Sequence, residues 1–426
     1  MSSYTVKRGD TLGKISIAHY GTFAQWIKIK EANPQLATRK KAIDGSPLIY
    51  PGDVLIIPHA VELPNTAANT KAIALDKSKK QDVSIYINGK LFTGFTGYTI
   101  EMPTDSFDSF SFSAPFDSTV KDFHEAFRPF TYKPCCVYYD GKKIFNGTLL
   151  TPNPSVTPES RTITLQGYPL CGVLNEAHLP ESKYPPSYKG MTIKQIADDI
   201  AAPFGFKVVL DGDEGSAFDD VEYDPGETLL SFLNKLAGQR GLLITNNTDG
   251  DLLLWQPKEK NAQASFAEGV LPFVSCTPSF DAQQFYSHVT GFSKVSSKKD
   301  SASYTYENSF LTKRGVLRPY SYTVDDATDT DLEASVKAKA ARMFASAVSY
   351  DVTVLGHKDK NGNLYAKNGC VTLKAPCAMV YRETKFLVDS VQLKRSDSEG
   401  DQTTLKLVLP GSRVSGTLPK SFPWED

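Results

Sequence analysis

The sequence predicts an α+β fold that is dominated by strands, and two observations carry that prediction. The 426 residues include 20 Tyr and 24 Phe against 5 Met, and aromatic residues favour pleated strands. Turn dipeptides such as Asn88-Gly89 and Asp140-Gly141 separate short apolar runs, which is the pattern of β-hairpins. Apolar residues at helical spacing are confined to a few segments. A chain of this length predicts about three domains.

Composition excludes several functional classes. The net charge of −1 gives no field that would attract nucleic acid or anionic lipid. No apolar run approaches the roughly 18 residues that span a bilayer, and the start MSSYTVKRGDTL lacks the apolar core of a signal peptide. The six cysteines contain no Cys-x-x-Cys pair, so we expect no metal site and a reducing compartment. We therefore expect a protein folded in a cytoplasm, which would reach the outside by lysis or by a delivery machine.

Residues 1–58 predict a small unit of order β-α-α-β. A strand at 4–7 leads into a turn that caps a helix, and a second helix is expected at 24–33. Pro51-Gly52 then forms a turn before a closing strand at 53–58.

This first unit resembles a LysM module through YTVKRGDTLGKISIAHYGTFAQWIKIKEANPQ and IYPGDVLIIP. The family is known for binding N-acetylglucosamine polymers, chiefly peptidoglycan and chitin. The resemblance implies a shallow groove between the first strand–helix turn and the loop after the second helix. Its positions here are Gly9, Asp10, Thr11, Leu12, Asn33, Pro34 and Gln35.

Two features of this unit leave its role open. The loop at 36–48 is long and basic, with Arg39, Lys40 and Lys41, and would cover or reshape the groove. The groove residues are also explained as a helix cap and a helix stop. LysM folds also dock proteins, so glycan contact and protein docking are both retained as hypotheses.

After a lysine-bearing linker at 59–82, residues 83–170 predict the first of two small β-barrel domains. The hairpin turn at Asn88-Gly89 and a second at Asp140-Gly141 organise its strands. We expect strands at 83–87, 91–95, 98–102, 107–112, 132–139, 142–150 and 161–168.

Residues 171–258 predict an α/β insert. Thr192 and Gln195 form a capping box before a helix at 193–202, and a strand follows at 206–210. Thr228 caps an amphipathic helix that ends at Gly238 or Gly241. This helix leads into a hairpin whose strands are 242–245 and 252–255.

Residues 259–411 predict the second β-barrel domain, which contains one long helix at 331–348. A strand is expected before the helix at 285–291. Four more are expected after it, at 350–355, 370–373, 386–393 and 403–409. The tail at 412–426 is predicted to be extended, with Trp424 either exposed or an anchor for a neighbour.

Four segments between Val83 and Gly411 carry a second resemblance, namely VSIYINGKLFTGFTGYTIEMPTDSFDSFSFSAPF, MTIKQIADDIAAPFGFKVV, GETLLSFLNKLAGQRGLLI and FLVDSVQLKRS. Through these segments the chain resembles the baseplate hub proteins of contractile phage tails, the late-control protein D and Mu-type hub family. The resemblance implies a homotrimeric ring whose barrels continue the tail tube and hold the spike. It also implies contact with baseplate wedge proteins and a place in the virion's tail baseplate, assembled in the host bacterial cytoplasm.

No catalytic set is predicted. The six histidines are scattered without an HExxH motif, and phosphate-binding loops and a GxSxG elbow are absent. Asp105 with Asp108, or Asp198 with Asp199, could form an acid pair, but acidic residues are common on surfaces. We therefore predict no catalytic residue and no cofactor. A structural hub is the favoured hypothesis, and a peptidoglycan-binding cell-wall hydrolase delivered with a tail is the alternative.

Overall fold

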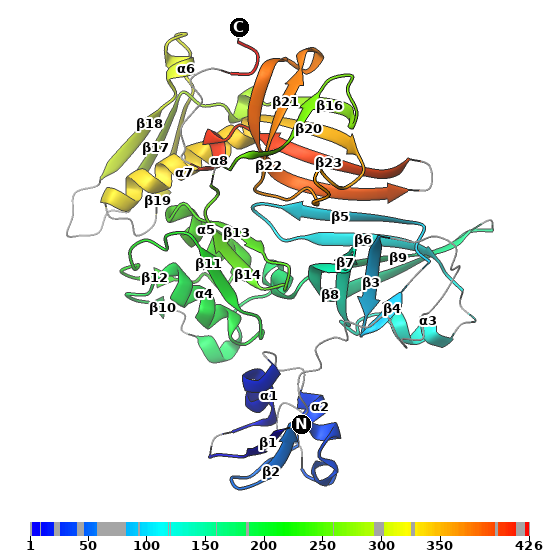
Figure 1. Ribbon diagram of the computed structural model, residues 1–426. Coiled ribbons are helices and arrows are strands. Elements are labelled where there is room, and N and C mark those ends of the chain that lie inside the picture. The colour runs from blue at the N-terminus through cyan, green and yellow to red at the C-terminus, as the bar shows by residue number, and fades with distance from the viewer. Residues whose placement is uncertain are drawn as a thin grey trace. The chain divides into compact units, whose positions relative to one another are not determined.

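The computed structural model describes residues 2–8, 10–20, 26–40, 47–57, 82–92, 94–117, 119, 121–158, 160–184, 187–258, 260–293, 302–324, 329–396, 399–414 and 422–425 (Figure 1). The chain divides into two compact units. Unit 1 is Met1–Lys71 with Asp199–Lys207, and unit 2 is Ala72–Asp198 with Val208–Asp426. We describe each unit by itself. The finer division into six segments stays a prediction.

The N-terminal part of unit 1 has the predicted order β-α-α-β. Its elements are β1 (Ser2–Thr5), α1 (Leu12–Tyr20), α2 (Trp26–Glu31), the 3-10 helix η2 (Pro34–Leu36) and β2 (Val54–Ile57). The two strands pair antiparallel, with Ser2 opposite Ile57. Seven buried side chains form its core, namely Val6, Leu12, Ile15, Ile29, Leu36, Leu55 and Ile57.

The main feature of unit 2 is a thirteen-stranded sheet. Its path runs β16-β20-β23-β22-β5-β6-β9-β8-β7-β3-β4, and β21 joins β15 to β22. The strands before the insert are β3 (Val83–Ile87), β4 (Lys90–Phe92), β5 (Gly97–Pro103), β6 (Ser109–Pro115), β7 (Pro134–Tyr139), β8 (Lys142–Val156) and β9 (Arg161–Pro169), with helix α3 (Lys121–Ala126) between β6 and β7. Those after it are β15 (Ala262–Ala267), β16 (Phe273–Phe280), β20 (Val348–Leu355), β21 (Cys370–Ala375), β22 (Val380–Ser396) and β23 (Gly400–Val408), with η6 (Pro376–Ala378).

Two predicted hairpins organise the first half of this sheet. Asn88-Gly89 joins β3 to β4, and Asp140-Gly141 joins β7 to β8. All four turn residues have positive φ, between 47° and 75°, which is the backbone of the tight turns that match strand twist.

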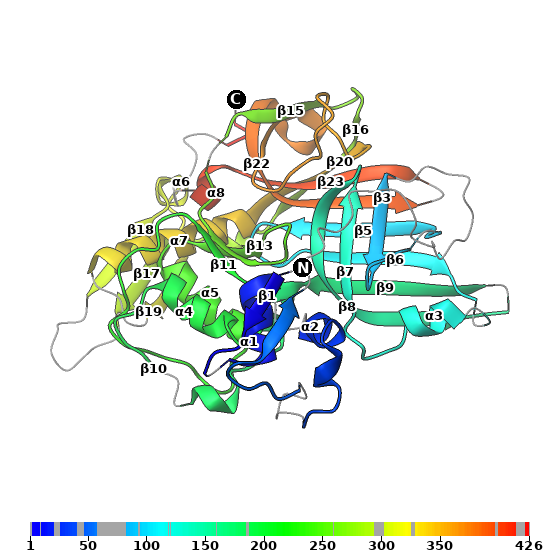
Figure 2. The same cartoon turned by 60° about the horizontal axis from the view of Figure 1, so that its bottom comes forward.

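The β-dominated α+β fold class is confirmed, but the strand pairing differs from two separate barrels. β5 pairs antiparallel with β22, Pro103 lying opposite Ser390, so both halves share one sheet. Figures 1 and 2 show the orange strands β22 and β23 beside the cyan strands β5 and β6. Among the described residues, the pairing forms no closed ring. The local turn signals predicted the strands, whereas the β5–β22 pairing is non-local.

The α/β insert has the predicted order of helices and hairpin. Its elements are η3 (Leu170–Asn175), η4 (Glu181–Lys183), β10 (Ser187–Tyr188), α4 (Ile193–Ala201), β11 (Val208–Asp211), β12 (Val221–Glu222), α5 (Leu229–Gln239), β13 (Leu243–Asn246) and β14 (Leu252–Trp255). Thr192 and Gln195 exchange both capping-box hydrogen bonds, at 2.9 and 3.3 Å. Thr228 caps α5 by accepting from the Ser231 N–H at 3.3 Å.

A second layer of unit 2 is a three-stranded sheet packed on the long helix. Its elements are η5 (Ala282–Gln284), β17 (His288–Ser293), β18 (Ser303–Glu307), α6 (Ser309–Thr312), β19 (Pro319–Val324), α7 (Asp329–Ala347) and α8 (Gly411–Val414). The strand order is β18-β17-β19. Gly291 lets β17 approach α7, because a Cβ there would lie 2.4 Å from a Val336 methyl group.

The C-terminal tail differs from the extended segment predicted. Its described part begins with α8 and ends with residues that pack into the core of unit 2. The Phe422 side chain is buried. Its ring lies 4.4 Å from that of Phe310, between centroids, and stacks on Trp424 at 4.8 Å. Trp424 also packs against Phe280, so this tryptophan anchors the chain to itself.

Candidate functional sites in the two units

The strand–helix turn of unit 1 is held by two side chains of the predicted groove. One carboxylate oxygen of Asp10 accepts hydrogen bonds from the Lys7 N–H at 2.7 Å and from the Tyr4 hydroxyl at 2.9 Å. The Lys7 N–H, with the Tyr4 hydroxyl, holds the pKa of Asp10 below its usual value. Thr11 caps α1 by accepting from the Lys14 N–H at 3.1 Å. Gly9 lies outside the described residues.

Asn33 connects α2 to β2 from inside the core. Its amide nitrogen donates to the carbonyls of Ile29 at 2.6 Å and Ile56 at 2.7 Å. Its amide oxygen accepts from the Ile56 N–H at 2.8 Å and from the Gln35 side chain at 3.1 Å. These four bonds use the full capacity of the amide. Asn33 is therefore committed to the fold of this unit.

The six described groove positions thus separate by exposure. Leu12 and Asn33 are fully buried. Thr11, Pro34 and Gln35 are exposed and Asp10 is half-buried. Pro34 begins the 3-10 helix η2, which places Gln35 beside Asn33. A ligand could reach only the side chains of the second group, which we call the surface rim: Asp10, Thr11, Pro34 and Gln35.

The basic loop after η2 is fixed to the turn before β2. The guanidinium of Arg39 pairs with the Asp53 carboxylate, with Nη2 to Oδ1 at 3.0 Å, and lies 5.2 Å from the centre of the Tyr50 ring. Arg39 and the Tyr50 N–H hold the pKa of Asp53 below its usual value. Lys40 is exposed, and Lys41 lies outside the described residues.

Sequence reasoning missed one surface of this unit, the outer face of β2. Leu55 and Ile57 point into the core, whereas Val54 and Ile56 are exposed, by 59% and 43%. Tyr50, just before the strand, is also exposed. A strand reading Val-Leu-Ile-Ile is apolar on both faces, and this signal could have indicated the surface.

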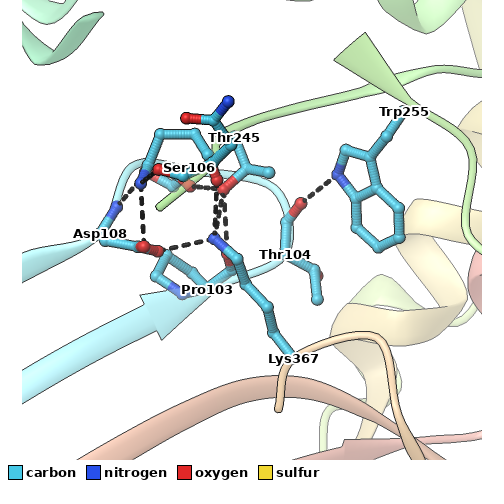
Figure 3. Close-up of polar contacts among 9 residues, drawn as sticks. Pro103, Thr104, Ser106, Asp108, Thr245, Trp255 and Lys367 are labelled. Carbon is cyan, nitrogen blue, oxygen red and sulfur yellow. Dashed lines mark hydrogen bonds and ion pairs between the residues drawn. The ribbon is translucent and has the colours of Figure 1, made fainter. Parts of the chain in front are cut away.

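Unit 2 contains a buried polar cluster, drawn in Figure 3, at the loop between β5 and β6. The Asp108 carboxylate accepts from the Lys367 ammonium at 2.6 Å and from the Asn246 amide at 2.9 Å. The Asp108 N–H donates to Asn246 at 2.7 Å. Lys367 also donates to the Thr245 hydroxyl at 2.8 Å, which in turn donates to the Ser106 carbonyl at 2.7 Å. Burial raises the pKa of Asp108, while Lys367 and Asn246 lower it.

The same loop makes a second set of contacts through its first residues. The Trp255 indole N–H donates to the Thr104 carbonyl at 3.0 Å (Figure 3). The Thr104 hydroxyl donates to Asp389 on β22 at 2.8 Å. Arg413 on α8 binds Asp389 through two nitrogens, at 2.8 and 3.0 Å, and Asp105 at 2.8 Å.

The loop from Pro103 to Asp108 therefore joins four parts of unit 2, namely β13 and β14 of the insert, the loop carrying Lys367, strand β22 and helix α8. Asp105 and Asp108 enter different ion pairs, with Arg413 and Lys367. Sequence reasoning named these two acids without their partners, which lie more than 250 residues away.

Within the described residues, no three His, Cys, Asp or Glu side chains gather where they could hold a metal. None of the described helices combines the length and apolar character needed to cross a membrane.

Comparisons with protein families identify two segments. Residues 4–58 match the LysM domain. Residues 180–256 match the second domain of gp44-like baseplate hub proteins. The second match covers most of the α/β insert, whose β13 and β14 contact the polar cluster described above.

Comparisons with whole proteins extend the likeness to most of the chain. Baseplate hub protein gp44 of Escherichia phage Mu is 25% identical over 339 residues, which cover 76% of this chain and 87% of the Mu protein. The 43 kDa tail protein of prophage MuSo2 from Shewanella oneidensis has a TM-score of 0.65 at 21% identity, covering 78% of this chain and 99% of that chain. The tail protein from Neisseria meningitidis MC58 has a TM-score of 0.65 at 22% identity, and the match covers 78% of this chain and 97% of the Neisseria chain. These two structures share the fold.

Proposed function

We propose that the chain, whose residues 4–58 match the LysM domain, is a baseplate hub protein and forms the rigid joint of a contractile tail. Three copies would form a ring that connects the tail tube to the central spike and meets the surrounding wedge proteins. The observation that carries the proposal is the match along 87% of the Mu hub protein. Assembly would take place in the host cytoplasm.

The polar cluster supports a mechanical role. A joint between tube and spike must hold its parts in one arrangement, because it transmits force without chemical turnover. Buried ion pairs such as Asp108 with Lys367 are directional, and breaking one is strongly unfavourable once its partner stays buried. The contacts of the loop from Pro103 to Asp108 therefore support a rigid unit 2, in which the α/β insert is held in one orientation against the thirteen-stranded sheet.

The solution mass of the purified full chain tests the ring. One chain is 46.8 kDa, so light scattering should give about 140 kDa for a trimer with closed symmetry. A monomer that stays monomeric when mixed with purified tube and spike proteins would overturn the trimeric joint.

For the LysM domain we propose contact with peptidoglycan through the surface rim. The rim carries exposed or half-buried amide, carboxylate and hydroxyl groups, which suit the hydroxyl and acetamido groups of a glycan. The exposed apolar face of β2, with Val54 and Ile56, supports the second candidate, which is docking onto another baseplate protein.

Paired variants separate these two roles. The double variant Pro34→Ala/Gln35→Ala changes only exposed side chains of the rim. It should weaken binding to isolated sacculi by about tenfold or more, since each lost hydrogen bond or contact contributes about 1 kcal/mol. The matched control Val54→Ser/Ile56→Ser should bind sacculi as the unchanged protein does. The reverse pattern, with binding unaffected by the rim variant, would reject the rim and favour docking.

A further inference from the structure

A polar cleft of about 620 Å³ lies between α5 of the insert and α7 with β19. The two helices pack beside one another (Figure 1). Three cations line the cleft, namely Lys235, Lys339 and Arg342, and no acidic side chain is among the described lining residues. Lys235 pairs with Glu227, whereas the other two cations come from α7. The described lining of the cleft therefore carries a net positive charge, to which Lys339 and Arg342 contribute without an ion-pair partner among the described residues.

Arg342 is the main source of this charge. Among the described residues, its guanidinium makes no hydrogen bond or ion pair, and the side chain is half-buried in the wall of the cleft. Burial, with nearby Arg413, lowers the pKa of Arg342. A guanidinium without an ion-pair partner presents parallel N–H donors that match a carboxylate, so Arg342 is available to bind an anion in the cleft.

Helix α5 is shaped to admit that guanidinium. A Cβ at Gly238 would lie 2.2 Å from Arg342 Nη2 and 3.0 Å from Nη1. Glycine within a helix is less favourable than alanine because it loses more backbone freedom on folding. Gly238 therefore opens the wall of the cleft at the point where the guanidinium rests.

Lys339 adds a second uncompensated charge one helical turn before Arg342. Its ammonium lies 5.9 Å from the ring centres of Tyr320 and of Tyr322. Burial, with Arg342, lowers the pKa of Lys339. Like charges three positions apart on a helix repel one another. An anion between them would remove this repulsion.

The remaining lining groups favour a peptide over a simple ion. Ser231, Asn234 and Ser335 present hydroxyl and amide groups. The amide oxygen of Gln239 is buried and meets no donor among the described residues. A peptide segment offers N–H donors as well as carboxylates, and the guanidinium fork matches a carboxylate. We propose that the cleft between α5 and α7 binds the carboxylate side chains of an acidic segment from a partner protein.

Peptide binding to the full chain tests this proposal. The probe is a fluorescein-labelled hexaglutamate peptide, followed by fluorescence anisotropy at low ionic strength, with hexaglutamine as the uncharged control. Arg342→Gln should weaken hexaglutamate binding by about tenfold or more. Lys142→Gln, which removes an exposed cation elsewhere in unit 2, should leave binding unchanged. Equal binding by the Arg342 and Lys142 variants would overturn the site.

Two further measurements show whether a loss of hexaglutamate binding reflects a lost contact or a misfolded protein. Gly238→Ala keeps every charge but displaces the guanidinium, so it should also weaken hexaglutamate binding. Arg342→Met removes a cation that repels Lys339 on the same helix face and should raise the Tm of the free protein by about 1–3 °C, while abolishing binding. A lower Tm for Arg342→Met would show that Arg342 has a structural partner and would overturn the proposal. Binding of citrate without binding of hexaglutamate would reject a peptide as the occupant in favour of a free anion.

Discussion

Asn33 joins an α-helix and a β-strand through a single side-chain amide. Its contacts with both backbone groups of Ile56 take the place of a neighbouring strand. Without them, the Ile56 N–H and carbonyl lose their partners at the edge of β2. The residue therefore contributes to stability more than a typical surface asparagine.

Asn33→Ala should lower the free energy of unfolding of the LysM domain by about 2–3 kcal/mol, because it leaves buried polar groups unsatisfied. Urea unfolding followed by Trp26 fluorescence measures it. Gln35→Ala, which removes one exposed donor to Asn33, should change it by less than about 1 kcal/mol. Equal losses in both variants would mean that the buried amide is not the anchor.

His357 makes the stability of unit 2 depend on pH. It is buried, with Nε2 at 3.0 Å from the Tyr98 hydroxyl and Nδ1 at 2.9 Å from the Thr403 hydroxyl. Burial lowers the pKa of His357, although Asp401 opposes this shift. In the unfolded chain the imidazole titrates near its usual pKa of about 6.5. Below that pH the unfolded state binds more protons, so stability falls with falling pH.

We expect the free energy of unfolding of the full chain, obtained from urea titrations, to decrease between about pH 7.5 and 5, by at most about 1.4 kcal/mol per pH unit from this residue. His357→Gln should flatten that decrease. The control His124→Gln changes an exposed histidine of the same unit and should retain it. An unchanged slope in His357→Gln would assign the pH dependence to other groups.

At the scale of elements, helix caps and tight turns could be predicted from the local sequence, whereas some strands could not. The capping residues Thr192 and Thr228 and the turns at Asn88-Gly89 and Asp140-Gly141 were predicted, because each acts on neighbouring backbone. Strand β16 was missed, since its exposed residues include polar ones that mask the alternation of a strand. β22 was predicted only at 386–393, because the charged start of this strand does not resemble a buried one.

The contact between α7 and β17 gives a prediction at the scale of two packed elements. Gly291→Ala should lower the free energy of unfolding by about 1–3 kcal/mol, since the added methyl group would overlap Val336. The double variant Gly291→Ala/Val336→Ala should recover part of that loss. Gly226→Ala, at an open position, is the control for substitution of a glycine. A loss in Gly291→Ala no larger than in that control would contradict the close packing.

At the scale of the whole of unit 2, ion pairs between distant segments decide how the parts are joined. The sequence predicted the β-dominated class and the helix-and-hairpin insert. It could not predict that Lys367 would neutralise Asp108, because nothing near either residue in the chain indicates the other. For the same reason the groove hypothesis included Leu12 and Asn33, whose burial depends on the packing of distant elements.

Lys367→Ala should reduce the free energy of unfolding by about 3–5 kcal/mol, because it leaves the Asp108 carboxylate buried without its cation. The double variant Asp108→Asn/Lys367→Ala removes both charges and should be more stable than Lys367→Ala alone, and Asp108→Asn is the second single variant of the cycle. Denaturant unfolding of the single and double variants gives the coupling energy. Simple additivity of the two changes would show that the pair does not act as a unit.

The pairing of β5 with β22 also has a consequence for synthesis. Strand β5 can pair with β22 only after Ser390, the partner of Pro103, has been synthesised. Ser390 follows about 290 residues later, which corresponds to about 15–60 s of translation. During that time the nascent chain exposes the unpaired edge of β5, which can pair with strands of other chains and so promote aggregation. A ribosome that stops early releases a chain whose sheet is incomplete. The thirteen-stranded sheet can therefore complete its pairing only after β23 (Gly400–Val408) has been synthesised.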